Sequence, residues 1–177
     1  MSMHQTLLPL FTALVFGATV ASEANSQSDP VLEYAAKFTC GRVPASDTAD
    51  GDADVVVGVY ATSINIHNPQ RFTRVSFNKK VVLAKAEGQP KATPVQRHDF
   101  LGPDQAEFVD CPLIYSLLSI EPPAHIEGFV VIEVVPEERF QLPPLPLDVV
   151  GKYSARASTG EVSSLDVVVY SPMQITH

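Results

Sequence analysis

The sequence contains no tryptophan, only two cysteines and few basic residues. Twelve lysines and arginines stand against 20 aspartates and glutamates, which gives a net charge of −8. Nucleic acids and anionic membranes are bound by clustered lysines and arginines, so this composition argues against both partners. Hydrophobic residues make up 45% of the chain. A length of 177 residues with this apolar content predicts one domain with a sizeable core.

Only one hydrophobic run is long enough to be a targeting segment. Leu7–Ala21 has the length of a signal-peptide core, and Thr19-Val20-Ala21 places small residues where a signal peptidase cuts. The run is short for an uncleaved anchor, because a membrane span needs about 20 apolar residues. We therefore expect a cleaved signal peptide over residues 1–21 and a disordered leader over 22–30. The mature protein is then exported, periplasmic or extracellular, without a stable membrane anchor.

The two cysteines, Cys40 and Cys111, are an even number in a chain that we expect to be exported. An oxidising compartment favours a disulfide between them. Each lies at the end of a predicted strand, which fits a bridge across the edge of a sheet. Two buried thiols are the alternative. A metal site is not indicated by two thiolates so far apart in the sequence, without clustered histidines.

Helical periodicity is almost absent, and short alternating runs take its place. The most distinctive run is Val55–Pro69, which is apolar on both faces in its first half and alternates in its second half. It ends at Asn68-Pro69, because proline cannot donate to a strand ladder. We predict that this run is the central strand of the sheet.

The remaining runs predict an all-β protein with at most one short helix, over 112–120. Further strands are expected over 32–40, 72–86, 92–98, 105–111, 128–135, 147–157 and 164–170. The Asn-Pro turn is typical of a hairpin to the next strand, and Lys79 on that strand's apolar face favours a bulge or an edge. Seven or eight strands indicate an antiparallel, immunoglobulin-like or jelly-roll-like β-sandwich over 31–172, with a tail at 173–177.

Four sequence blocks carry a resemblance: Y-A-T-S-I-N-I-H-N-P at Tyr60–Pro69, L-G-P-D-Q-A-E-F-V-D-C at Leu101–Cys111, G-F-V-V-I-E at Gly128–Glu133 and L-D-V-V at Leu147–Val150. Together they resemble a group of small secreted bacterial proteins of unassigned function. The order of strands and turns is also similar to the β-sandwich of the sensory rhodopsin transducer family. That layout implies a binding module that forms homo-oligomers. Export departs from that family, whose members work inside the cell.

The strongest candidate for a binding site lies at the end of the central run. His67 follows Asn65 and precedes Asn68, and the polar tip of a rigid scaffold is a common place for a binding site. We therefore take Asn65, His67 and Asn68 as candidate ligand-binding residues. Stabilisation of the turn at Pro69 is the alternative role for His67 and Asn68.

Metal and catalytic patterns are less specific. His98, His125 and Glu127 offer imidazole and carboxylate ligands, and His125 and Glu127 share a strand face, but their spacing fixes no third ligand. The acidic run Asp47–Asp54 does not place glycine and glutamate where an EF-hand calcium loop needs them, and a solvated loop is the simpler interpretation. The serines have no G-x-S-x-G elbow.

The sequence thus predicts an exported, disulfide-containing protein that binds an unknown protein or small-molecule ligand, without catalysis and without a cofactor. A metal-dependent or hydrolytic enzyme that uses His67, His98 or His125 is one alternative, and a structural subunit of an oligomer is another. The proline-rich segment Pro136–Pro146 is either an exposed contact arm or a cap on the end of the sheet.

Overall fold

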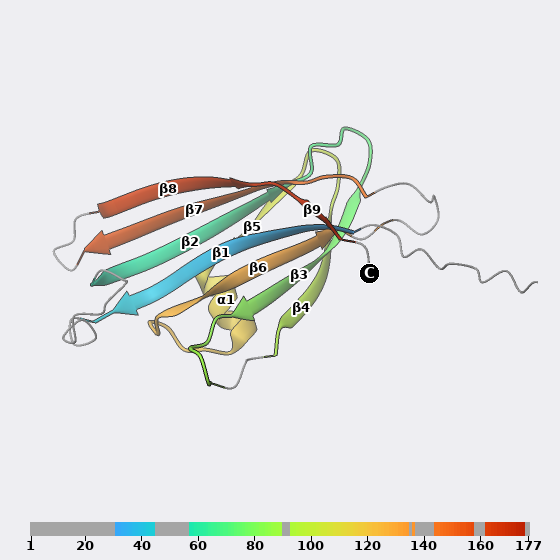
Figure 1. Ribbon diagram of the computed structural model, residues 1–177. Coiled ribbons are helices and arrows are strands. Elements are labelled where there is room, and N and C mark those ends of the chain that lie inside the picture. Colours follow the sequence, from blue (N-terminus) through green and yellow to red (C-terminus); the bar gives the residue numbers. More distant parts are fainter. Residues whose placement is uncertain are drawn as a thin grey trace, which may run out of the picture.

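The computed structural model describes residues 31–44, 57–89, 93–134, 136, 144–157 and 162–175, without the side chains of 162–165. The elements in these residues (Figure 1) are β1 (Val31–Val43), β2 (Gly58–His67), β3 (Val75–Leu83), β4 (Val95–Leu101), β5 (Ala106–Asp110), α1 (Cys111–Leu118), β6 (Ile126–Val134), β7 (Asp148–Ala157), β8 (Val162–Tyr170) and β9 (Met173–Ile175). The predicted signal peptide, the leader and the run Asp47–Asp54 lie outside the described residues. In the part described, no helix is long and apolar enough to cross a membrane.

The strands pair antiparallel throughout. Their order is β4-β3-β6-β1-β2-β7-β8, with β5 added to β2 and β9 added to β1. The all-β class with one short helix is therefore confirmed for the described residues. Nine strands are joined into one hydrogen-bonded sheet, where the sequence predicts seven or eight strands in a sandwich. The immunoglobulin-like or jelly-roll-like arrangement stays a prediction.

The sheet splits between β1 and β2. These strands pair only from Gly41 to Val43 on β1, and beyond this point β2 pairs with β5 while β1 pairs with β9. Gly41 marks the split with a φ of 102°, and a Cβ there would lie 2.1 Å from the carbonyl oxygen of Ala124. Both the left-handed backbone and the close approach require glycine at this position.

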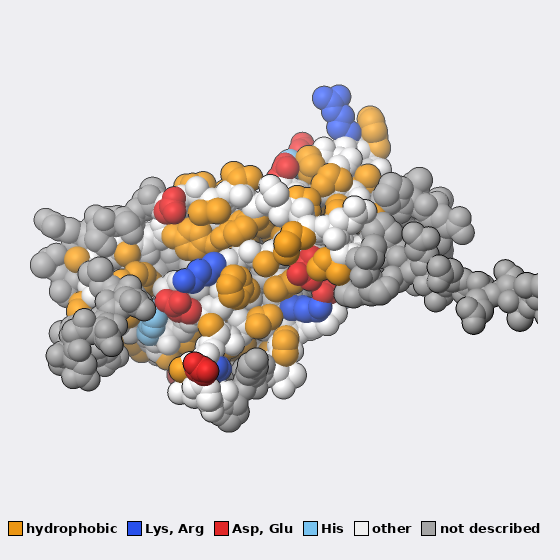
Figure 2. Space-filling view, in the orientation of Figure 1, with side chains coloured by type: hydrophobic (Ala, Val, Ile, Leu, Met, Phe, Trp, Pro, Cys, Tyr) orange, Lys and Arg blue, Asp and Glu red, His pale blue; other side chains and the backbone are white. Residues whose placement is uncertain are grey.

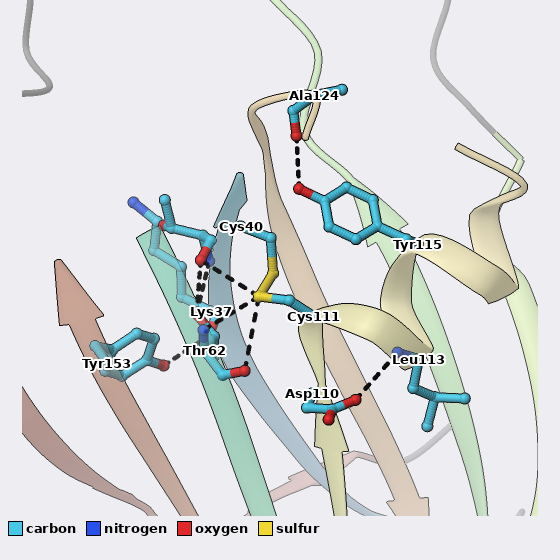
Figure 3. Close-up of a disulfide and its surroundings, with 10 residues drawn as sticks. Lys37, Cys40, Thr62, Asp110, Cys111, Leu113, Tyr115, Ala124 and Tyr153 are labelled. Carbon is cyan, nitrogen blue, oxygen red and sulfur yellow. Dashed lines mark hydrogen bonds between the residues drawn. A yellow bond between two sulfur atoms is a disulfide. The ribbon is translucent and has the colours of Figure 1, made fainter. Parts of the chain in front are cut away.

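Where β1 and β2 are no longer paired, side chains on β2 and β7 hydrogen-bond to the backbone of β1. Thr62 Oγ1 accepts a hydrogen bond from the Thr39 amide at 3.0 Å and donates to the Thr39 carbonyl at 2.9 Å. The Tyr153 hydroxyl donates to the Lys37 carbonyl at 2.6 Å (Figure 3). Three backbone groups on the open edge of β1 are thereby satisfied, the Thr39 amide and the carbonyls of Thr39 and Lys37.

One face of the sheet carries the core. The predicted alternation in the central strand is confirmed, because Thr62, Ile64 and Ile66 are buried while Asn65 is exposed. Helix α1 covers this face, and it begins where the Asp110 carboxylate accepts from the Leu113 amide at 3.0 Å. The largest fully buried side chains are Tyr34, Phe38, Phe77, Ile64, Ile66, Ile114, Ile132, Val81, Val109, Val130, Val134 and Val149.

The predicted bridge between Cys40 and Cys111 is present and ties β1 to the start of α1 (Figure 3). The Thr62 amide donates to the Cys111 sulfur at 3.2 Å, so the bridge also contacts β2 where the sheet splits. The bonded cysteines are 71 positions apart. Closing a loop of that length contributes about 4 kcal/mol in the chain-entropy model.

Two predictions about β3 are wrong. The loop after β2 is no hairpin, because β2 pairs with β1, β5 and β7 whereas β3 pairs with β4 and β6. Lys79 marks neither a bulge nor an edge, since β3 is an interior strand with an unbroken register. The sequence cannot show that carboxylates on β4 and β5 meet Lys79 inside the fold.

Two further predictions concern the C-terminal tail at 173–177 and the proline-rich segment Pro136–Pro146. Met173–Ile175, predicted within the tail, forms β9 on the edge of β1. Leu145 packs against the core, which fits the cap interpretation at that position. Phe140 and Leu142 lie outside the described residues.

Candidate functional site

Among the described residues, the most exposed large hydrophobic side chain lies in the loop that follows β2. Phe72 is 91% exposed, and Arg71 and Arg74 beside it are exposed as well. The loop stands out from the sheet at the upper right of Figure 1, and Figure 2 shows basic and hydrophobic side chains at its tip. The Arg74 guanidinium lies 4.9 Å from the centre of the Phe100 ring, on the adjacent strand β4. This end of the molecule therefore displays two phenylalanines and two arginines.

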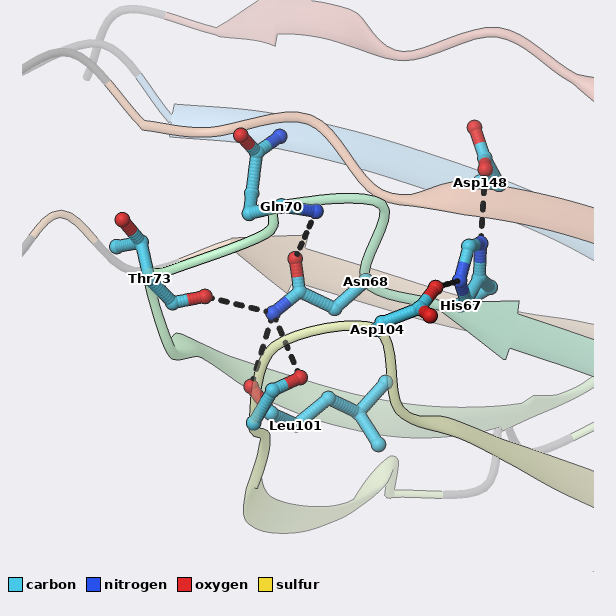
Figure 4. Close-up of polar contacts among 8 residues, drawn as sticks. His67, Asn68, Gln70, Thr73, Leu101, Asp104 and Asp148 are labelled. Carbon is cyan, nitrogen blue, oxygen red and sulfur yellow. Dashed lines mark hydrogen bonds and ion pairs between the residues drawn. The ribbon is translucent and has the colours of Figure 1, made fainter.

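Asn68 holds this loop in place and is fully buried. Its amide nitrogen donates to the carbonyls of Thr73 at 2.9 Å, Leu101 at 3.1 Å and Gly102 at 2.9 Å. Its side-chain oxygen accepts from the Gln70 amide at 3.0 Å (Figure 4). The amide group has no further donor to offer a ligand. Asn68, predicted as a ligand-binding residue, thus fixes the loop to β4.

His67 lies between two carboxylates. Its Nδ1 is 3.0 Å from Asp148 Oδ2 and its Nε2 is 3.1 Å from Asp104 Oδ1 (Figure 4). A carboxylate only accepts, so both contacts are hydrogen bonds only when the two ring nitrogens carry protons, as they do in the imidazolium. The hydrogen bond to Asp148 and then that to Asp104 raise the pKa of His67. This latch joins the end of β2, the turn between β4 and β5, and the start of β7.

Asn65 lies apart from the loop. It is exposed on β2, directly opposite Phe108 on β5 and Val150 on β7. The three predicted ligand-binding residues therefore take three different positions. Asn65 is on the open sheet face, His67 is in the latch and Asn68 is inside the loop.

The three predicted metal ligands, His98, His125 and Glu127, are not brought together at one point. His125 Nε2 is 3.8 Å from Glu127 Oε1, and its ring contacts the edge of Tyr60. His98 pairs with Asn78, which in turn lies opposite Glu133, eight residues along the strand from His125. At about 3.3 Å per residue, the two histidines are separated by about 26 Å along the strand direction. Among the described residues, no three His, Cys, Asp or Glu side chains are placed to hold a metal ion.

A second cation between two carboxylates lies inside the fold. Lys79 Nζ is 2.9 Å from Asp99 and 2.5 Å from Glu107, and the lysine side chain is only 7% exposed. Burial acts to raise the pKa of Asp99, but hydrogen bonds from Lys79 and from the Phe100 amide hold this pKa below its usual value. The cluster ties β3 to β4 and β5 and faces the core, so its place is structural.

A hollow of about 600 Å³ lies at the end of α1. Tyr115 and Glu121 are the ionisable groups among its described lining residues. The Tyr115 hydroxyl donates to the Ala124 carbonyl at 2.7 Å, and burial raises its pKa. A hydroxyl that is already bonded and hard to ionise makes a poor general base.

No protein-family model, no curated protein and no solved structure matches this chain. The resemblances to the secreted bacterial proteins and to the transducer family stay expectations. A functional assignment must therefore rest on the geometry of the described residues.

The sequence analysis predicted His67 and Asn68 as binding residues but did not single out Phe72. The run after Asn68-Pro69 reads as a strand, which hides an exposed phenylalanine among alternating residues. The useful signal is the pair Arg71-Phe72 directly after a turn, since arginine and phenylalanine at a loop tip are typical of contact residues.

Proposed function

We propose that this chain is an exported binding module that contacts a protein partner through the contact loop, residues 68–74, and the adjacent Phe100. The observation that carries the proposal is the exposure of Phe72 on a loop held by a fully buried asparagine. Burying a phenylalanine side chain stabilises by about 1.5–3 kcal/mol relative to leaving it in water. A partner with an apolar pocket recovers that energy on binding.

The rigidity of the contact loop supports this role. Association costs free energy for every segment that it orders. The Asn68 side chain makes four hydrogen bonds, and the Asp104 amide adds one to the Gln70 carbonyl at 3.1 Å. The loop is therefore held in place before a partner arrives, which lowers the cost of ordering it.

The charge of the contact loop indicates the chemistry of the partner. Arg71 has no carboxylate partner among the described residues, and Arg74 is stacked on Phe100. Arginine and aromatic residues are enriched where binding energy concentrates. We expect the partner to offer an apolar pocket flanked by carboxylates. The disulfide is compatible with export, and the separated histidines fit binding without catalysis.

A photo-crosslinking experiment tests the proposal. A photoreactive phenylalanine is placed at position 72, or at position 129 as the control, and the protein is expressed in cells of its source. Phe129 is also exposed but lies on the open face of β6. We expect one discrete adduct from position 72 that position 129 does not give.

The captured protein is then purified and its affinity is measured. Phe72→Ala should weaken binding at least tenfold without lowering the melting temperature, while Phe129→Ala should leave the affinity within twofold. Equal adducts from both positions, or an unchanged affinity of Phe72→Ala, would contradict a role for the contact loop.

Assembly into an oligomer through β8 is the second candidate. Within the described ranges β8 pairs with β7 alone, and Val167 and Val169 are exposed on it. The Asp166 carboxylate accepts from the Val167 amide at 2.8 Å, and so occupies one donor that strand addition would use. This places assembly second. Light scattering on the mature protein decides between a monomer and an oligomer.

A further inference from the structure

Two arginines lie in one row on the open face of the sheet, at the end opposite the contact loop. Arg42 on β1 and Arg156 on β7 are both register partners of Val59 on β2. Residues directly opposite one another project from the same face. Neighbouring strands are about 4.8 Å apart, so the two arginine backbones are separated by about 10 Å.

Small side chains leave a groove beside this row. Ala61 and Ser154 are register partners in the next row along β2 and β7. With Arg42, Val59 and Arg156 they line a hollow of about 380 Å³. Beside this row the register between β7 and β8 shifts by one residue, because Ala155 pairs with Ser164 and Arg156 pairs with Val162.

The arginines of this groove differ from the lysines on β1 and β3. Lys37 is paired with Glu127, Lys79 with Asp99 and Glu107, and Lys80 with Glu133. Neither Arg42 nor Arg156 has such a partner in the described part of the chain. The same holds for Lys152, which lies on β7 two rows along from the row of Val59. In a protein with a net charge of −8, Arg42 on β1 and both Arg156 and Lys152 on β7 thus lie on one face of the sheet without a carboxylate partner among the described residues.

We propose that this groove binds a tetrahedral oxyanion, phosphate or sulfate, either free or as an ester group on a larger ligand. Guanidinium groups donate pairs of parallel hydrogen bonds to such oxygens, and two of them can converge on one anion. The Ser154 hydroxyl adds a donor at the floor, and Val59 contacts the apolar part of an ester. Lys152 lies where a second anionic group of a longer ligand would pass.

An NMR titration of the mature, oxidised protein tests the proposal. Sodium phosphate, sodium sulfate and methyl phosphate are each added to ¹⁵N-labelled protein, with sodium chloride at matched ionic strength as the reference. We expect saturable shifts of the Val59, Ala61 and Ser154 amides with the oxyanions and not with chloride. Tighter binding of methyl phosphate than of phosphate would indicate an ester ligand, and the reverse would indicate the free ion.

Matched variants decide whether the groove is responsible. Arg42→Gln with Arg156→Gln should weaken binding at least tenfold, while Arg71→Gln, an exposed arginine in the contact loop, should change it less than twofold. Thermal unfolding checks that the double variant stays folded. Absence of saturable shifts, or equal loss in Arg71→Gln, overturns the proposal. Phe72→Ala should leave anion binding unchanged, so the result is independent of the contact loop.

Discussion

Lys79 and His67 each lie between two carboxylates, yet they are placed at very different depths. The Lys79 side chain is 7% exposed and faces the core, whereas the His67 side chain is 36% exposed at the end of the sheet. Lysine keeps its charge over the whole physiological range, while histidine changes charge close to neutral pH. Each cluster joins three chain segments, but only the His67 latch depends on a cation that can lose its charge near neutral pH.

The difference in depth determines how strongly each cluster acts. An ion pair out of water resists screening by salt, but leaving one partner unpaired there is costly. An exposed pair contributes less than about 1 kcal/mol and is screened. The protein therefore uses a permanent cluster to fix β3, β4 and β5, and a titratable one beside the contact loop.

The largest effect is expected from Lys79→Ala. This change leaves Asp99 and Glu107 facing each other without a cation, and should lower the free energy of unfolding by about 3 kcal/mol. Urea denaturation of the mature, oxidised protein measures it. The triple variant Lys79→Met, Asp99→Asn, Glu107→Gln should recover most of the loss. A loss below about 1 kcal/mol for Lys79→Ala would show that water enters the cluster.

Asn68→Ala should come next. It removes the donor for three carbonyls and the acceptor for the Gln70 amide, and should cost about 2 kcal/mol. Amide hydrogen exchange should become faster over 69–74 and stay unchanged in β6. Asn68→Asp keeps the acceptor and loses the donors, so it should also destabilise. If Asn68→Asp unfolds like the wild type, the donors to Leu101 and Gly102 do not hold the loop.

His67→Gln should have a smaller effect, below about 1 kcal/mol, that depends on pH. The folded-state pKa of His67 is raised above its unfolded value. The stabilisation is therefore complete below a pH of about 6.5 and is lost as the pH rises through the folded-state pKa. Urea denaturation at low and at high pH should show a gap between wild type and His67→Gln that closes as the pH rises. A gap that widens with pH contradicts the imidazolium.

The smallest effect is the response to salt. The coupling between His67 and Asp148, measured by a double-mutant cycle with His67→Gln and Asp148→Asn, should fall by a few tenths of a kcal/mol between low and molar salt. The coupling between Lys79 and Glu107 should change less, since both groups are shielded from the solvent. Equal salt dependence of the two couplings would remove the distinction between the clusters.

Local patterns predicted the elements well. Alternation located β2 and the buried Ile64 and Ile66, the cysteine count predicted the bridge, and the proline after Cys111 predicted a short helix to within two residues. The same patterns gave β3 the wrong partner, because a turn sequence does not show which strands pair with the strands on either side of it. Hydrogen bonds from Asn68 to residues more than thirty positions away direct this loop, and no local signal contains them.

The sequence by itself determined the β-rich class, the strand faces and the even number of cysteines, because these depend on side-chain type and on a period of two residues. Tertiary structure alone decided that Lys79 and His67 each meet two carboxylates, that Phe72 is left in water, and that Arg42 and Arg156 share one row. These features depend on how residues far apart in the chain are placed. Their positions are determined by the register of the strand ladders, which exists only once the sheet has formed.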